Sequence, residues 1–348
     1  MERLQIGRYP SELVAVSGLH KLDDALDLLS FLKADDFVSS ELVKNHSRSA
    51  ASAKRDAKRI ASHASLASLY AGLCLTSPPE ISFLPGYYCI LNLAKCVSLS
   101  GPYSNEFDHH SRWHGATYNA RGRAAQSVLT DEVRVRGGGA LAHFYKTLTC
   151  HAITSDKVMK LKDFYHIVPG IGSELSIVSG KRRSVWFPEF SAQDVAGQIT
   201  VEAVVKTWTE KGAEKKYEGN VRRLPLLKGF RKKPNTKGVF VKIFPSISGL
   251  TLIDQVRSNV ATEFLSVYGD DYACSEQAES FPMPEEFASA LAFFHLSSVC
   301  RYNPEFMEKL AKSKAWPMLL AMRRHSLYNS IISAWSYIIQ KDYRIQDS

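Results

Sequence analysis

The sequence predicts an α+β protein in which helical N-terminal and C-terminal parts pack together with a β-rich, basic middle segment. Apolar residues recur at helical spacing near both ends of the chain, whereas short runs of β-type composition follow one another between Glu174 and Phe244. We place the helical N-terminal part with its His-rich loop at residues 1–125, the β-rich basic middle at 126–270 and the helical C-terminal part at 271–348. Because no internal repeat or low-complexity linker separates these parts, we expect one continuous unit.

Three helices are expected in the N-terminal part. The first covers Leu22 to Leu32, where apolar residues recur at helical spacing. The second covers Ser49 to Leu75, with alanines on one face and basic residues on the other, and Pro78-Pro79 end it. The third is expected to begin after Pro85 and to end at Gly101-Pro102.

The chain changes character between residues 101 and 150. Residues 101–123 are rich in His, aromatic, Asn and Gly residues without a sustained period, which predicts a long loop. Ser127 to Arg136 alternates like a strand, and Gly137–Gly139 separates it from a helix-like segment at 140–150. The glycine triplet lacks the spacing of phosphate-binding loops, so we interpret it as a tight turn.

Strands and then helices are expected in the rest of the chain. The strand-like runs are residues 174–180, 184–188, 198–209 and 238–244. They suit antiparallel pairing, with a long lysine-rich connection between the last two. From Pro284 onward helix signals return, and Pro304 and Pro317 are placed as helix starts.

Composition excludes several classes of protein. A chain of 348 residues with 45% hydrophobic residues can bury a substantial core. No run reaches the roughly 18 apolar residues of a membrane helix, and the N-terminus lacks the apolar core of a signal peptide. The six cysteines contain no C-x-x-C pair, so we expect reduced core residues rather than zinc ligands or disulfides. These features predict a cytoplasmic protein without membrane contact.

One segment carries the whole net charge. Lys211 to Lys242 contains 11 Lys and Arg residues against 2 Glu, and the rest of the chain is balanced at 33 against 33. Such a surplus is expected of a surface that meets the phosphates of nucleic acid or another anionic partner, and a solvated loop is the alternative. Tyr217 and Phe230 lie within the segment and suit stacking on bases. The candidate nucleic-acid-binding residues are Lys215, Lys216, Arg222, Arg223, Lys228, Arg231, Lys232, Lys233 and Lys237.

Three stretches of the sequence resemble a known family. They are residues 86–95 (GYYCILNLAK), His114-Gly115, and residues 296–305 (LSSVCRYNPE), in this order. Together they resemble the YaaC-like family of bacterial proteins over roughly residues 50 to 310. The resemblance implies a bacterial, cytoplasmic and mainly helical protein. It implies no reaction, since the family has no established activity.

His114, Lys95 and Asn92 are the candidate catalytic residues. Asn92 and Lys95 are three residues apart on an apolar helix and can face the same spot, where a lysine is costly to bury without a partner. Both an anion clamp and a structural pair that caps backbone groups fit this pattern. His114 lies in the segment D-H-H-S-R-W-H, which we interpret as loop structure. No metal site and no cofactor are expected, because a third ligand and a complete binding motif are missing.

Metal-free ribonucleases of the HEPN type place an Arg and a His a few residues apart on a helix. Arg136 and His143 have this separation, but three glycines lie between them. Each glycine in a helix interior would destabilise the helix by on the order of 1 kcal/mol. Arg59 and His63 are separated by too few residues. Neither pair fits the pattern well.

Our leading hypothesis from the sequence is a subunit of a protein complex that contacts nucleic-acid phosphates through residues 211–242 and has no catalysis of its own. The first alternative is a metal-free HEPN-like ribonuclease or another phosphodiester-cleaving enzyme that uses His114, Lys95 and Asn92. The second is a structural component whose basic loop docks an acidic protein partner.

Overall fold

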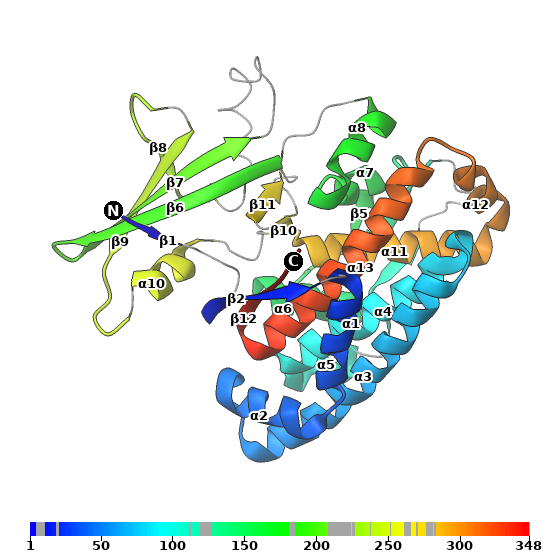
Figure 1. Ribbon diagram of the computed structural model, residues 1–348, viewed down its shortest axis with the longest axis horizontal. Helices are drawn as coiled ribbons and strands as arrows, with labels where there is room; N and C mark the ends of the chain where they lie inside the picture. Colours follow the sequence, from blue (N-terminus) through cyan, green and yellow to red (C-terminus); the bar gives the residue numbers. More distant parts are fainter. Residues whose placement is uncertain are drawn as a thin grey trace.

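The computed structural model describes residues 1–4, 11–18, 21–110, 113–118, 127–180, 185–207, 224, 227–236, 238–250, 252–260, 266–268, 271–275, 281 and 283–347. It consists of a helical body and a sheet that extends away from it (Figure 1). The helical body contains α1 (Lys21–Leu32), α2 (Asp35–His46), α3 (Ala50–Thr76), α4 (Pro79–Ser100), α5 (Phe107–His110), α6 (Ala140–Thr149), α7 (Leu161–Tyr165), α8 (Gly172–Ser179), α11 (Glu285–Tyr302), α12 (Pro304–Ala311) and α13 (Trp316–Ile339). Short 3-10 turns cover Ser104–Glu106 and Pro169–Ile171.

The long helices α3 and α4 form the centre of the helical body. The side chain of Ser49 accepts a hydrogen bond from the backbone N–H of Ser52 and caps the start of α3. The predicted alanine face of α3 is buried, together with Ile60, and packs against α4. Small side chains on this face let α4 approach closely, so that α4 is buried along most of its length.

The start of α4 differs from the prediction. We expected the helix to begin after Pro85, but it begins at Pro79 and passes through Pro85. Pro79 occupies the first helical position, where the missing N–H would have no partner within the helix. Pro85 removes only the bond to the carbonyl of Ile81, whose side chain is exposed, so that water can reach this part of the first turns.

The C-terminal helices begin where the prolines indicated. Helix α11 follows Pro284, α12 begins at Pro304, and α13 has Pro317 in its second position. The side chain of Asn303 accepts a hydrogen bond from the backbone N–H of Phe306 at 3.3 Å and caps α12. Helices α11 and α13 pack on α4, so the N-terminal and C-terminal helices share one core.

The extended sheet is antiparallel throughout. It contains β1 (Glu2–Leu4), β6 (Val185–Val195), β7 (Gln198–Thr207), β8 (Arg231–Lys232), β9 (Val239–Pro245), β10 (Ser266–Tyr268) and β11 (Asp271–Ser275). The strand order is β10-β11-β6-β7-β9-β8, and β1 also pairs with β6. A two-residue turn joins β6 to β7 at Ala196 and Gly197, both with positive φ, as such hairpins require. Helix α10 (Leu252–Asn259) packs near this sheet.

Two smaller sheets adjoin the helical body. Strands β3 (Ala116–Tyr118), β4 (Glu132–Val135) and β5 (Lys157–Lys160) form an antiparallel sheet. Strands β2 (Ser11–Gly18) and β12 (Lys341–Asp347) form a parallel pair. The predicted strand at 127–136 is therefore shorter than expected, because residues 128–130 turn around the side chain of Asp131, which accepts from the backbone N–H of Ser127.

One predicted strand is a helix. Residues 174–180 were expected to be β-type, but they belong to α8 and its end at Gly180, whose φ is 67°. Leu175 and Val178, three residues apart, both pack on the helical core, while Ile177 between them is 70% exposed. Burial at this spacing follows a helix rather than a strand.

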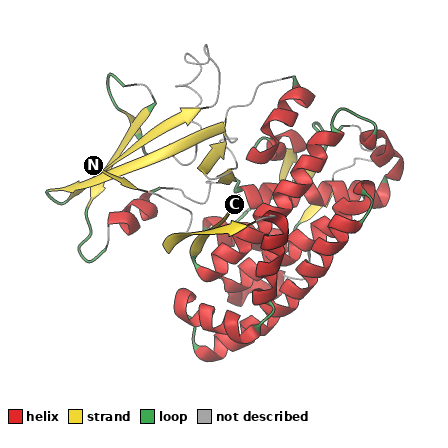
Figure 2. Ribbon diagram, in the orientation of Figure 1, coloured by secondary structure: helices red, strands yellow, loops and turns green. Residues whose placement is uncertain are grey.

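The described residues form two hydrophobic cores. One core joins the helices with residues 116–175, and the other lies between the extended sheet and α10, at residues 190–260. Figure 2 shows how far helices and strands are segregated. The fold is thus α+β, as the sequence predicted, although residues 127–180 pack with the helices. Cys74, Cys89 and Cys96 are buried and free, whereas Cys150 is exposed.

Candidate functional site

Helix α4 presents a polar stripe on the side opposite to its apolar core face. Tyr88, Asn92 and Lys95 follow one another at four and three residues, which aligns them along one face of the helix. Asn92 is buried, whereas Tyr88 and Lys95 are half-buried. Two of the three candidate catalytic residues therefore lie together, as the sequence predicted for Asn92 and Lys95.

His63 on α3 meets this stripe. Its Nδ1 lies 2.9 Å from Oδ1 of Asn92, and Nδ2 of Asn92 donates to the backbone carbonyl of Tyr88 at 2.8 Å. His63 is half-buried, and burial lowers its pKa, with the charges of Lys95 and Arg59 acting in the same direction. The amide of Asn92 thus holds an imidazole next to the lysine.

His114 approaches the same stripe from the segment after α5. Its Nδ1 lies 2.6 Å from the hydroxyl of Tyr87, and the two rings stack at 5.5 Å between centroids. The ring of Tyr88 meets His114 edge-on at 6.3 Å. Burial lowers the pKa of His114, and the charges of Arg301 and Lys95 lower it further. We call His63, Lys95 and His114 the histidine–lysine cluster.

Glycines hold the His114 segment against the start of α6. The backbone N–H groups of Ala140 and Leu141 donate to the carbonyls of Trp113 and His114, at 2.7 and 3.0 Å. Gly139 has a φ of 99°, and a Cβ there would lie 2.5 Å from the backbone of Gly115. The glycine triplet is therefore a packing turn, as interpreted from the sequence, and these N–H groups are not available to a phosphate.

The charge around the histidine–lysine cluster is positive. Burial lowers the pKa of Lys95, which has no carboxylate partner among the described residues. Arg59 forms an ion pair with Asp108, and its guanidinium lies 5.4 Å from the ring of Phe107. Arg301 is exposed on α11. A half-buried lysine beside two uncharged imidazoles favours an anion as its partner.

The structure separates the members of one of the two Arg–His pairs considered from the sequence and keeps those of the other together. Arg136 forms an ion pair with Asp156 at 2.6 Å, while His143 is buried in α6 with its Nε2 2.9 Å from the carbonyl of Tyr103. These two residues serve separate structural contacts. Arg59 and His63 lie one turn apart on α3, and the charge of Arg59 acts on the His63 imidazole.

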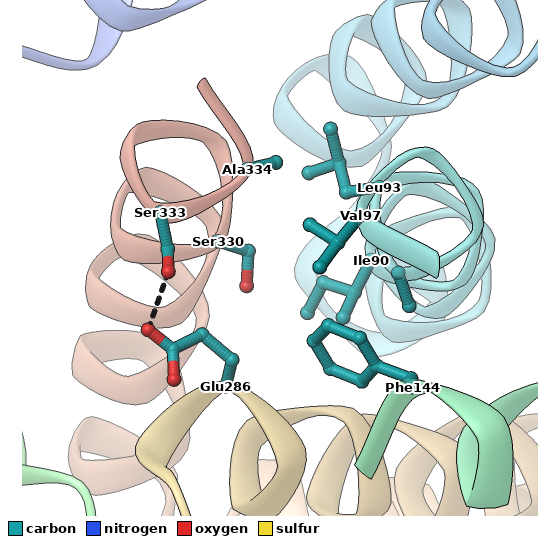
Figure 3. A pocket seen from close by; sticks show the side chains of 9 residues that line it. Ile90, Leu93, Val97, Phe144, Glu286, Ser330, Ser333 and Ala334 are labelled. Carbon is teal, nitrogen blue, oxygen red and sulfur yellow. Dashed lines mark hydrogen bonds between the residues drawn. The ribbon is translucent and has the colours of Figure 1, made fainter. Parts of the chain in front are cut away.

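A small cavity of about 10 Å³ lies on the opposite, apolar face of α4. Figure 3 shows Leu93 and Val97 on one side of it, and Glu286 bonded to Ser333 on the other. The Ser333 hydroxyl donates to Oε1 of Glu286 at 2.6 Å. This volume suits about one water molecule and excludes a substrate, so the cavity belongs to the core.

Part of the basic segment lies in the extended sheet. Lys215, Lys216, Arg222, Arg223 and Lys237 fall outside the described residues. Lys228, Arg231 and Lys232 are exposed, the last two on the edge strand β8. Lys233 forms an ion pair with Glu202 of β7.

Some described residues of this segment contact the second core. Phe230 is half-buried against that core. Lys242 donates to the backbone carbonyl of Asn259 at 2.5 Å. Lys228, Arg231 and Lys232 are therefore exposed cations in the described part of the segment.

The family profile of the YaaC-like Protein family matches residues 30–331 of the chain. The chain belongs to the YaaC-like family. No curated protein and no solved structure matches it. Among the residues described in this YaaC-like protein, no three His, Cys, Asp or Glu side chains are placed to hold a metal ion. No helix in the described part is long and apolar enough to cross a membrane.

Sequence reasoning missed one member of the site in this YaaC-like protein. Arg59 and His63 were set aside because their spacing is short for the ribonuclease pattern, yet the structure places His63 beside Asn92. The signal was present on the basic face of α3, where both residues occupy one stripe at four-residue spacing. Only the packing of α3 on α4 shows that this stripe meets Lys95.

Proposed function

We propose that this YaaC-like protein acts in the cytoplasm as a subunit that binds nucleic acid, with the basic segment at residues 211–242 in contact with the phosphates. The observation that carries the proposal is the charge surplus of this one segment, which equals the net charge of the whole chain. Lysine and arginine contacts of this kind displace counterions from nucleic acid, so that binding weakens steeply as salt rises.

The described part of the segment supports this proposal. Arg231 and Lys232 lie on a short strand at the open edge of the sheet, where side chains are exposed. Phe230, next to them, lies with its ring 5.9 Å from the ammonium group of Lys242. Cations on an open edge can follow a phosphate backbone without disturbing the core beneath them.

A salt titration of binding to short single- and double-stranded DNA and RNA tests the proposal. The double variant R231E/K232E should weaken binding at least tenfold at low salt and flatten the salt dependence. Lys233 stays unchanged because its pairing with Glu202 contributes to the sheet. The matched control is K157E/K160E, which reverses two exposed lysines of β5 and should bind as the wild type does.

The same titration separates the alternative partner. One outcome is that the wild type binds no nucleic acid at low salt and instead binds an acidic protein stably, with R231E/K232E binding that protein less tightly. This result would show that the segment docks a protein. Equal binding by the wild type and R231E/K232E would contradict both forms of the proposal.

A second candidate function is metal-free phosphodiester cleavage at the histidine–lysine cluster. The observation that favours it is the placement of Asn92, Lys95 and His114 around one stripe of α4, with no described carboxylate bonded to Lys95. Two uncharged imidazoles and an ammonium group supply a proton acceptor, hydrogen-bond donors and charge stabilisation for a phosphate. H114A should fold and lose cleavage of a labelled RNA in the presence of a chelator. A purified wild-type protein that leaves every RNA intact would contradict this function.

A further inference from the structure

The hydrogen bonds of His63 determine which of its nitrogens carries the proton. Asn92 donates from Nδ2 to the carbonyl of Tyr88, so its Oδ1 is the atom that faces His63. An amide oxygen can only accept, and therefore Nδ1 of His63 must carry a hydrogen. In the uncharged imidazole this leaves Nε2 with its lone pair, and Nε2 has no partner among the described residues. His63 thus presents a proton acceptor.

The hydrogen bond of His114 has the opposite polarity. The Tyr87 hydroxyl is buried, and burial raises its pKa, so it keeps its proton. Nδ1 of His114, at 2.6 Å, is the acceptor for that proton among the described residues. Nε2 of the uncharged His114 ring therefore carries the hydrogen and presents a donor. The two imidazoles are complementary.

Both rings lie close to Lys95. Their neighbours on α4, Asn92 and Tyr88, are one helical turn apart, about 6 Å along the axis. Lys95 lies one turn beyond Asn92 on the same stripe, and its charge acts on both imidazoles. The other charged groups facing the rings are the guanidinium of Arg59, which Asp108 pairs, and that of Arg301. The site therefore has excess positive charge and attracts an anion.

We propose that His63, Lys95 and His114 bind one phosphate group of single-stranded RNA, with Lys95 and the Nε2–H of His114 donating to its oxygens and Nε2 of His63 accepting the proton of the adjacent 2′-hydroxyl. The proton transfer rests on the second candidate function, whereas phosphate binding does not. Tyr88 and Tyr70, whose rings stack at 5.3 Å, provide an aromatic surface beside the site for a base.

The reaction balances with these groups alone. The 2′-oxygen attacks phosphorus as its proton moves to Nε2 of His63, and the bond from phosphorus to the 5′-oxygen breaks. The ammonium group of Lys95 gives a proton to the departing 5′-oxygen, which suits a lysine whose pKa burial has lowered. The products are a 2′,3′-cyclic phosphate and a 5′-hydroxyl. Exchange of one proton from His63 to solvent and one from solvent to Lys95 restores the site.

Nitrogen-15 NMR of the imidazoles tests the arrangement without any activity. We expect His63 to be the Nδ1–H tautomer and His114 to be the Nε2–H tautomer in the free protein above pH 7. Inorganic phosphate should raise the pKa of both rings, because binding and protonation are linked. His46, whose Nε2 bonds to the carbonyl of Ile338 on another side of the helical body, is the internal control and should not respond. Identical tautomers for His63 and His114, or rings that phosphate leaves unmoved, would overturn the proposal.

Variants separate this site from the basic segment. K95M should abolish the response to phosphate, whereas K54M, which replaces an exposed lysine of α3, should keep it. Y87F removes the donor to His114 and should shift that ring toward the Nδ1–H tautomer while His63 stays unchanged. R231E/K232E should retain the full response, so that failure of phosphate binding and failure of nucleic-acid binding by the basic segment are read independently. If the wild type responds to phosphate but does not cleave RNA, the phosphate-binding site is supported and the proton-transfer step is contradicted.

Discussion

Histidines in two regions of the helical body have different kinds of partners. His295 on α11 is fully buried, and its Nε2 lies 3.2 Å from a carboxylate oxygen of Asp131. His325 on α13 likewise has its Nε2 2.6 Å from Oε1 of Glu285. In both pairs a carboxylate of the protein is the partner of Nε2, and it can balance a positive charge on the imidazole.

The imidazoles of the histidine–lysine cluster have neutral partners, and these contact Nδ1 instead of Nε2. Asn92 and Tyr87 each hold one imidazole nitrogen and contribute no charge. The difference teaches that the structure places carboxylates beside His295 and His325, but leaves Lys95 beside two uncharged rings where solvent has access. A site that a protein leaves electrostatically incomplete in this way is a candidate for ligand binding.

The largest expected loss of stability comes from removing the carboxylate partner of a buried histidine. D131A leaves buried His295 without its acceptor and should lower the free energy of unfolding by about 3 kcal/mol, measured by urea denaturation. N92A removes the neutral partner of half-buried His63 and should cost about 1 kcal/mol. Equal losses of stability in D131A and N92A would show that the carboxylate and the neutral partner stabilise their histidines equally.

Acid should weaken the fold through His295. Burial lowers its pKa, and the bond to Asp131 opposes this only in part. As pH falls below 6.5, His295 takes up a proton in the unfolded chain before it does so in the folded protein. The free energy of unfolding therefore decreases between pH 6.5 and the lower pKa of His295 in the folded protein. H295Q should lose less stability over this range, by up to about 1.4 kcal/mol per pH unit, in urea denaturation at pH 7, 6 and 5. Parallel pH profiles for H295Q and the wild type would show that His295 does not titrate on unfolding.

Removing Lys95 should stabilise the protein. The lysine is half-buried without a described carboxylate partner, so K95M relieves its desolvation and should raise the free energy of unfolding by about 1 kcal/mol. The same variant should raise the pKa of His63 and His114, because it removes a positive charge near both rings. K54M on the exposed surface should change stability by less than about 0.5 kcal/mol. A destabilised K95M would indicate that Lys95 has a structural role.

The smallest effect is expected in the extended sheet. Lys233 pairs with Glu202, but its side chain is 43% exposed. K233A should therefore lower the free energy of unfolding by less than about 1 kcal/mol, as for other ion pairs in contact with water. A larger loss in urea denaturation would show that this pair contributes to the core of the sheet.

Much of the fold could be predicted from periodicity and proline positions. The helices at both ends, the hairpin strands of the sheet and the starts at Pro304 and Pro317 follow from local chemistry. The helix at 172–179 could not, because a short apolar run fits both a strand and a helix until its packing surface is known. Pro85 was misplaced as a helix start because tolerance of a proline in the early turns depends on what covers the helix.

The candidate site was predictable in part. Asn92 and Lys95 share a helix face, so spacing alone places them together. His63 joins them through packing of two helices, and His114 through a turn that depends on Gly115 and Gly139, which are distant from α4 in sequence. Contacts of this kind arise from the tertiary fold and leave no local pattern.

The parallel pairing of β2 with β12 has a consequence for how the chain folds. These strands are separated by more sequence than any helix pair of the body, so their direct closure from an open chain is entropically expensive. Once α1 and α13 have packed in the helical core, however, the two strands are already neighbours. The pair should therefore form late, and its backbone amides should exchange with solvent earlier than those of α4. Amide exchange of β2 thereby reports on the packing of α1 against α13.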